Sequence, residues 1–149
     1  MKVSEIEITY THQSKTAGVV KTSDDLYKVF IGAFPKNRIA LKEYVYAAYL
    51  RADAGVLCVM KVSEGAINES LFDVRGIMQA ALKVNAVGVA VCHNHPSGNM
   101  KPSGMDIKAT NRIKEACSIM GLNFIDHLII SPVKGKYYSF AGETDENNA

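Results

Sequence analysis

The stretch His93–Asp106, "HNHPSGNMKPSGMD", gathers side chains that can bind a metal ion. His93 and His95 stand one residue apart, and Asp106 closes the stretch. Neutral imidazole nitrogens and a carboxylate oxygen are ligands that Zn²⁺ accepts at about 2.0–2.2 Å. Three such ligands leave a fourth position for water, and the ion lowers the pKa of that water toward about 7. The residue types therefore predict a catalytic zinc site.

A buried strand is expected to carry the two histidines. The apolar run "AVGVAVC" at residues 86–92 is short and contains β-branched residues, which is typical of a strand covered on both faces. Side chains two residues apart in a strand point the same way. His93 and His95 can therefore share one crevice while Asn94 points away. A turn containing proline and glycine follows, so the next element can return a third ligand to the same point.

That next element is predicted to be a helix with Ser103 as its N-cap and Asp106 in its first turn. The helix dipole favours an ionised carboxylate there. The buried face of the helix and the glycine that ends it are expected at Ala109, Ile113, Ala116, Cys117, Met120 and Gly121. Ser103-x-x-Asp106 is by itself an adequate capping pattern, so the assignment of Asp106 as a ligand depends on the two histidines.

The complete pattern, His-x-His-Pro, six residues, then Ser-x-x-Asp, resembles the JAMM (MPN) metalloprotease motif. The wording "HNHPSG" resembles the RadC family in particular. "DHLII" at Asp126–Ile130 and "YYS" at Tyr137–Ser139 match further stretches of that family. The resemblance covers about Lys42 to Phe140. It implies an α/β fold, a single JAMM/MPN-like domain whose mixed central sheet is flanked by helices in a cytidine-deaminase-like architecture.

The resemblance also implies a function. A zinc-dependent metallopeptidase or isopeptidase of this family would hold Zn²⁺ with His93, His95 and Asp106, and its substrate would be a peptide or protein. An upstream glutamate would hold the attacking water, and Glu43 matches that glutamate by position. In a strand, Glu43 would share a face with apolar residues, whereas its rivals Glu64 and Glu69 lie in expected loops. The Ser103 hydroxyl would help to stabilise the oxyanion.

Other functions remain open from the sequence. JAMM relatives also serve as non-catalytic scaffolds, and RadC proteins carry a name associated with DNA repair. A zinc deaminase would need His-x-Glu and Pro-Cys-x-x-Cys, which do not occur. A structural zinc site would need a fourth protein ligand, for which Cys92 or Cys117 is a candidate. His127 is expected to be either a buried, hydrogen-bonded imidazole or a group that supports a metal ligand.

The rest of the chain alternates between predicted helices and strands. Alternation at Ile6, Ile8 and Tyr10 predicts a first strand. Helices are expected over residues 22–34 and 70–84, the second with Ser70 and Asp73 as a capping pattern. Further strands are expected over residues 41–50, 56–62, 122–130 and 136–140.

Length and composition limit the domain organisation and the classes of function that the chain can have. With 149 residues, 48% hydrophobic and 21% charged, one domain over residues 1–149 is expected, with a core at about 36–141 and a polar tail at 142–149. The net charge of +2 gives no support to nucleic-acid binding. The three cysteines suggest reduced thiols, and there is no signal peptide or long apolar span, so a cytoplasmic protein is expected. The helix-hairpin-helix region that commonly precedes this domain in RadC proteins is expected to be absent.

Overall fold

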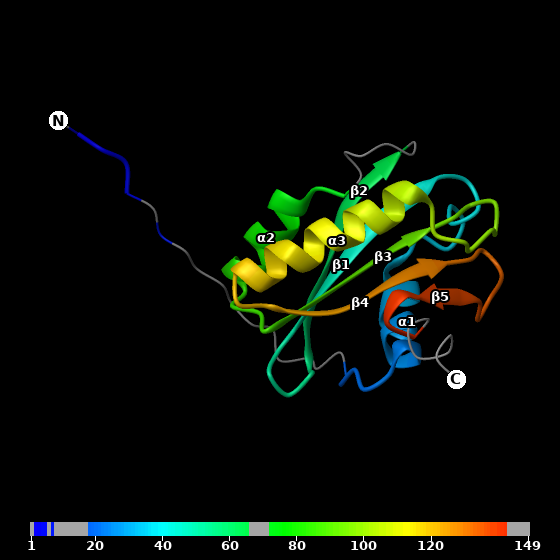
Figure 1. The fold of residues 1–149 in the computed structure, drawn as a ribbon, viewed down its shortest axis with the longest axis horizontal. Coiled ribbons are helices and arrows are strands. Elements are labelled where there is room, and N and C mark those ends of the chain that lie inside the picture. Colours follow the sequence, from blue (N-terminus) through cyan, green and yellow to red (C-terminus); the bar gives the residue numbers. More distant parts are fainter. Residues whose placement is uncertain (1, 6, 8–17, 66–71, 143–149) are drawn as a thin grey trace.

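In the computed structural model, five strands form one mixed sheet within residues 2–5, 7, 18–65 and 72–142, which are the residues that the structure describes (Figure 1). The strand order is β2-β1-β3-β4-β5. The strands are β1 (Glu43–Leu50), β2 (Val56–Gly65), β3 (Gly88–Asn94), β4 (Asn123–Ile130) and β5 (Tyr137–Ser139). The helices are α1 (Ser23–Ala33), α2 (Val74–Lys83) and α3 (Gly104–Ile119). The predicted α/β fold with a mixed sheet flanked by helices is confirmed.

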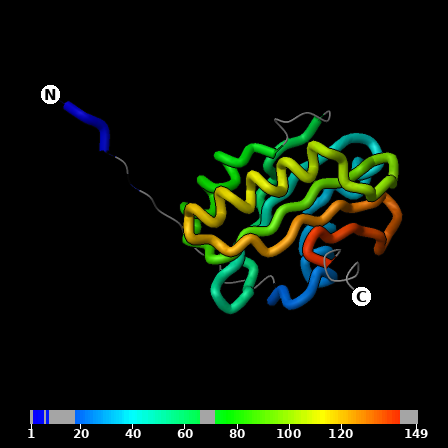
Figure 2. The backbone as a smooth tube through the Cα atoms, in the orientation of Figure 1, coloured from blue at the N-terminus to red at the C-terminus, as the bar shows by residue number. Residues whose placement is uncertain are grey.

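Helices cover both faces of the sheet, which explains why most residues of its central strands are apolar. α1 packs on one face, and α2 and α3 lie together on the other (Figure 2). All residues of β1 and β3 are buried. Their side chains alternate between the two layers: Val45 and Ala47 pack toward α2 and α3, whereas Tyr44 and Tyr46 pack toward α1.

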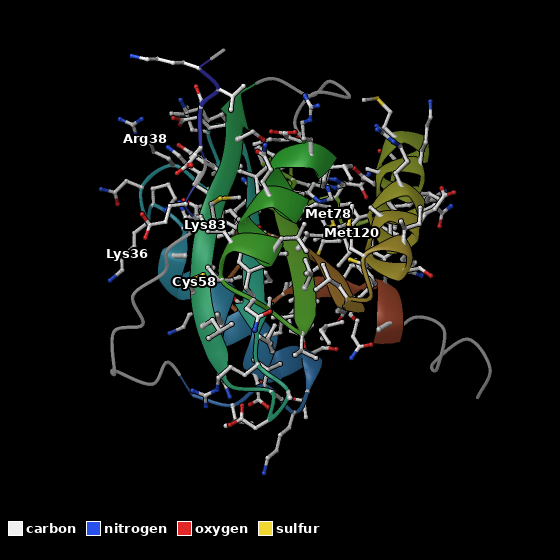
Figure 3. The ribbon with its side chains drawn as sticks, turned by 90° about the vertical axis from the view of Figure 1, so that its left-hand side faces the viewer. Lys36, Arg38, Cys58, Met78, Lys83 and Met120 are labelled. Carbon is white, nitrogen blue, oxygen red and sulfur yellow. The ribbon has the colours of Figure 1, made fainter. Side chains whose placement is uncertain are left out.

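A view from the side separates the two helical layers. Met78, on α2, lies where that helix faces α3, and Lys36 and Arg38 lie on the opposite side of the molecule (Figure 3). Met78 is buried in the layer under α2 and α3. Among the described residues, none of the helices has the length and apolar character that a membrane span requires. All three cysteines are free thiols, and Cys92 and Cys117 are buried.

The pairing of β3 with β4 determines where the predicted site forms. These two strands are parallel, and α3 is the crossover between them. α3 therefore begins at the end of the sheet where β3 stops. A capping box at Ser103 and Asp106 starts the helix, as predicted, and Gly121, with φ of 69°, follows its end.

The strand limits differ from the predicted ones for reasons of backbone pairing. β3 reaches His93 and Asn94 because these residues pair with Ile129 and Ile130 of β4, but it ends before His95, which was expected to lie in the same strand. β1 begins at Glu43 because the preceding residues form a turn, in which the Leu41 N–H donates to the Arg38 carbonyl at 2.9 Å.

Some predicted features fall partly or wholly outside the described residues. They are the strand expected at Ile6, Ile8 and Tyr10, the cap expected at Ser70 and most of the polar tail expected at 142–149. Asp73 is the N-cap of α2, where its carboxylate accepts from the Gly76 N–H at 3.0 Å.

Asn94 ties the end of β3 to the segment that leads into β1. Its side-chain carbonyl accepts from the Tyr44 N–H at 2.7 Å, and its amide donates to the carbonyls of Ile39 and Lys42 at 2.6 and 2.9 Å. Asn94 is fully buried. It points away from the face of His93, as predicted, and there it fixes the backbone on both sides of Glu43.

We expect Asn94→Ala to lower the free energy of unfolding by about 2–4 kcal/mol, because it leaves buried backbone groups without partners. Urea denaturation measures this change. Asn123→Ala, at an exposed position of β4, is the matched control and should change stability by about 0.5 kcal/mol or less. Equal effects of the two substitutions would show that Asn94 does not tie these segments together.

Candidate metal centre

The three predicted ligands converge at the end of β3. His93 Nε2 and His95 Nε2 lie 2.9 Å apart. The two carboxylate oxygens of Asp106 lie 3.2 Å from His93 Nε2 and 3.1 Å from His95 Nε2. His93 comes from β3 itself, His95 follows directly after the strand, and Asp106 comes from the first turn of α3. Strand and helix thus bring together residues that the sequence separates by a turn.

This spacing fits one divalent ion. Ligand atoms about 2.05 Å from a tetrahedral zinc ion lie about 3.3 Å from one another. The observed separations of 2.9–3.2 Å are close to that value. One ligand atom from each residue lies within 4.8 Å of the others. The donor set of two imidazoles and a carboxylate also matches the chemistry of zinc.

The turn between β3 and α3 orients His95. The His95 Nδ1 contacts the backbone carbonyl of Asn99. A carbonyl only accepts, so Nδ1 carries the ring proton and Nε2 presents a lone pair to the site. The Gly98 N–H donates to the His95 carbonyl at 2.9 Å, and Gly98 has a φ of 82°, a backbone conformation that suits glycine. The turn thus holds the imidazole in the required direction.

Charges in the cluster favour cation binding. Burial acts to raise the pKa of Asp106, but contacts with His93 and His95 and the Ser103 N–H outweigh it and hold this pKa well below its usual range. Burial lowers the pKa of His93. The Asp106 carboxylate raises the pKa of His95. A metal ion would replace the proton that His95 and Asp106 can share.

The site opens into a pocket of about 750 Å³. His95, Asp106, Ser103 and Glu43 all line it. Glu43 begins β1 and is buried, and this burial raises the pKa of its carboxyl to about 7, opposed by the charge of His95 and reinforced by that of Asp106. A carboxyl group with such a pKa can accept and release a proton near neutral pH.

The two rival glutamates differ in their surroundings. Glu64 lies in β2, and not in a loop as predicted, and its carboxylate is paired with Lys42 at 3.2 Å and with Lys61 at 3.1 Å. These lysines lower its pKa. Glu69 lies outside the described residues. Glu43 is thus the described candidate that combines burial with a place on the pocket wall.

Behind the ligands lies a buried polar group that the sequence only partly indicates. His127, on β4, has its Nε2 2.8 Å from His93 Nδ1 and its Nδ1 2.6 Å from the Thr110 hydroxyl. His127 is therefore a buried, hydrogen-bonded imidazole that directly contacts one of the predicted ligands. Thr110 was not predicted, although it lies one turn after Asp106 on the buried face of α3, where a hydroxyl is the unusual residue.

Comparison with known proteins gives a match over most of the chain. The family described as "RadC-like JAB domain" matches residues 20–145. The UPF0758 protein LL1007 of Lactococcus lactis subsp. lactis is 40% identical over 102 residues, which cover 68% of this chain and 44% of that protein. The UPF0758 protein GSU0386 of Geobacter sulfurreducens is 35% identical over 117 residues, which cover 78% of this chain and 49% of that protein. The chain thus spans about half the length of the curated relatives it matches.

We expect zinc to stabilise the protein by about 2.7 kcal/mol when the free ion is at 100 times its Kd. His95→Ala and Asp106→Asn should each abolish this gain, because each removes one ligand. The measurement is the melting temperature with and without Zn²⁺, taken for each variant separately. Asp24→Asn, at an exposed carboxylate on α1, is the control and should retain the full shift. A shift retained by the ligand variants would refute this site.

Proposed function

The chain belongs to the RadC-like JAB domain family, and from this premise we propose that it is a zinc-dependent hydrolase that cleaves amide bonds in a peptide or protein. The observation that carries the proposal is the convergence of His93, His95 and Asp106 at the wall of an open pocket that Glu43 also lines. The three ligands leave one tetrahedral position for water or substrate.

A zinc ion held by these three residues would act as a Lewis acid and make water a nucleophile at neutral pH. Glu43 then has the role of general base and acid. Its carboxylate takes a proton from the attacking water and later delivers it to the nitrogen of the leaving amine. The raised pKa of Glu43 supports this role, because such a carboxyl group both gains and loses a proton readily near pH 7.

The Ser103 hydroxyl can donate a hydrogen bond to the substrate. Its oxygen accepts from the Asp106 N–H at 3.1 Å, and its backbone N–H donates to the Asp106 carboxylate at 2.8 Å. Neither contact uses the hydroxyl proton. Since Ser103 is exposed at the pocket, its O–H can donate to the oxyanion that forms when water attacks a carbonyl.

The dimensions of the pocket suit a segment of a polypeptide. A volume of about 750 Å³ lies within the range of sites that enclose much of a bound ligand. The pocket wall combines Leu41 and Pro96 with the polar residues of the metal centre. A substrate carbonyl would therefore reach the site from an adjoining surface that is partly apolar.

Glu43→Gln should keep zinc binding and lower turnover by about 10²–10⁴-fold, because the amide cannot take a proton from water. Hydrolysis of a peptide library by the zinc-loaded protein is followed by mass spectrometry, and bound zinc by elemental analysis. Glu64→Gln, at an exposed carboxylate on β2, is the control. Unchanged hydrolysis in Glu43→Gln would remove this residue from the mechanism. Absence of hydrolysis in the zinc-loaded wild-type protein would favour a scaffold.

Ser103→Ala should lower kcat through loss of the hydroxyl donor and should also destabilise the fold by about 1 kcal/mol through loss of the helix cap. Ser103→Thr retains both the cap and the donor, so it should preserve most of the activity. Steady-state kinetics at a temperature where each variant is fully folded separates the two effects. If Ser103→Ala matches the wild-type kcat there, the serine serves only as a cap.

A further inference from the structure

We propose that Thr110 and His127 are positioning residues that keep the ring proton of His93 on Nδ1, and so leave Nε2 for the metal ion. The inference rests on the metal site within the proposed function and does not depend on hydrolysis. It assigns a role to two residues from α3 and β4 that do not themselves reach the ion.

The three side chains form one continuous line of hydrogen bonds. The Thr110 hydroxyl donates to the backbone carbonyl of Asp106 at 2.7 Å and lies 2.6 Å from His127 Nδ1. The opposite nitrogen of that ring, Nε2, lies 2.8 Å from His93 Nδ1. His93, Thr110 and His127 are exposed by only 1%, 2% and 0%. Each link is therefore shielded from water.

The directions of the other two hydrogen bonds follow from the one that the Thr110 hydroxyl donates to the Asp106 carbonyl. A hydroxyl has a single proton, and that of Thr110 is given to the Asp106 carbonyl. Its oxygen must then accept from His127, so the proton of His127 lies on Nδ1. Both ring nitrogens of His127 contact uncharged groups, and a buried imidazolium without a counter-ion is costly, so the ring is neutral. Its Nε2 consequently accepts from the His93 Nδ1–H.

The reverse order of donors would be incompatible with a bound metal. If the Thr110 hydroxyl donated to His127, the proton of that ring would move to Nε2, and His93 would carry its proton on Nε2. That proton would lie between His93 and Asp106, whose nearer carboxylate oxygen is 3.2 Å away. Only one of the two arrangements leaves His93 free to bind the ion, and it requires an acceptor at position 110.

Packing keeps the His127 ring in this orientation. Phe140 stacks on it with ring centres 4.7 Å apart and an angle of 10° between the planes. Phe72 meets His127 edge-on at 5.4 Å and His93 at 5.2 Å. The aromatic surroundings hold the imidazole without offering its nitrogens another strong hydrogen-bond partner, so the loss of Thr110 cannot easily be replaced.

Thr110→Val tests the proposal, because it preserves the shape of the side chain and removes the acceptor. We expect the affinity for zinc to fall by about 10- to 100-fold, and by no more than about threefold in Thr110→Ser, which keeps the hydroxyl. Competition with a chromophoric zinc chelator measures both values in the full chain. Thermal melting of the metal-free variants provides the control for folding. Wild-type affinity in Thr110→Val would overturn the proposal.

The imidazole tautomers provide a second readout. In the zinc-loaded wild-type protein labelled with ¹⁵N-histidine, long-range ¹H–¹⁵N NMR spectra should place the protons of both His93 and His127 on Nδ1. In the metal-free Thr110→Val protein, the proton of His127 should move to Nε2. A proton on Nε2 of His127 in the zinc-loaded wild-type protein would contradict the proposed direction of the chain.

A second pair of variants covers the case in which Thr110→Val fails to fold. His127→Gln places a carbonyl near the position of Nε2, whereas His127→Phe keeps a stacked ring and removes the acceptor. We expect the phenylalanine variant to bind zinc about 10-fold or more weakly than the glutamine variant. Equal affinities would contradict the proposal. Zinc binding without peptide hydrolysis would refute only the proposed function, and a wild-type protein that binds no zinc would refute both.

Discussion

The structure around β3 and α3 depends on three acceptor groups that face one another with little exposure to solvent. His93 Nε2, His95 Nε2 and the Asp106 carboxylate lie within 3.2 Å of their neighbours in the cluster. Lone pairs and a negative charge at such distances repel one another unless a cation lies between them. A proton shared between two of these groups would relieve part of the repulsion, whereas a divalent ion would relieve it for all three.

Two side chains at the end of β3, which point to opposite faces of the sheet, support this arrangement. On one side of β3, His93 points toward α3 and contacts His127, which in turn contacts Thr110. On the other side, Asn94 binds the backbone on either side of Glu43. Adjacent residues of β3 thus serve both parts of the site: His93 is a predicted ligand, and Asn94 fixes the segment that carries the proposed base, because successive side chains of a strand point to opposite faces.

Apolar side chains surround the buried polar groups and restrict their orientation. Phe72 and Phe140 surround the His127 ring, and the apolar face of α3 continues beyond Thr110 with Ile113 and Cys117. Polar groups in such surroundings are stabilised only when each finds its partner. The hydrogen bonds of His93 and His127 therefore set ring orientation as well as proton position, which is a requirement for a defined coordination geometry.

The sequence by itself determined the features that depend on neighbours along the chain. Spacing predicts that His93 and His95 share a face, that Ser103 caps a helix, and that Asp106 lies in its first turn, because strand and helix periodicity are local properties. The same reasoning located most of the helices and strands, with limits that shift by a few residues where pairing between strands decides them. Resemblance to a known family pointed to Glu43 among three glutamates.

Only the tertiary structure decided how distant segments meet. That Thr110 lies against His127 follows from the parallel register of β3 with β4 and from the packing of α3 on the sheet. That Asn94 fixes the segment before β1, and that Glu43 lines the pocket of Asp106, follow from the antiparallel register of β1 with β3. Register and packing depend on the shapes of side chains that are far apart in the sequence. Local periodicity carries no information about them.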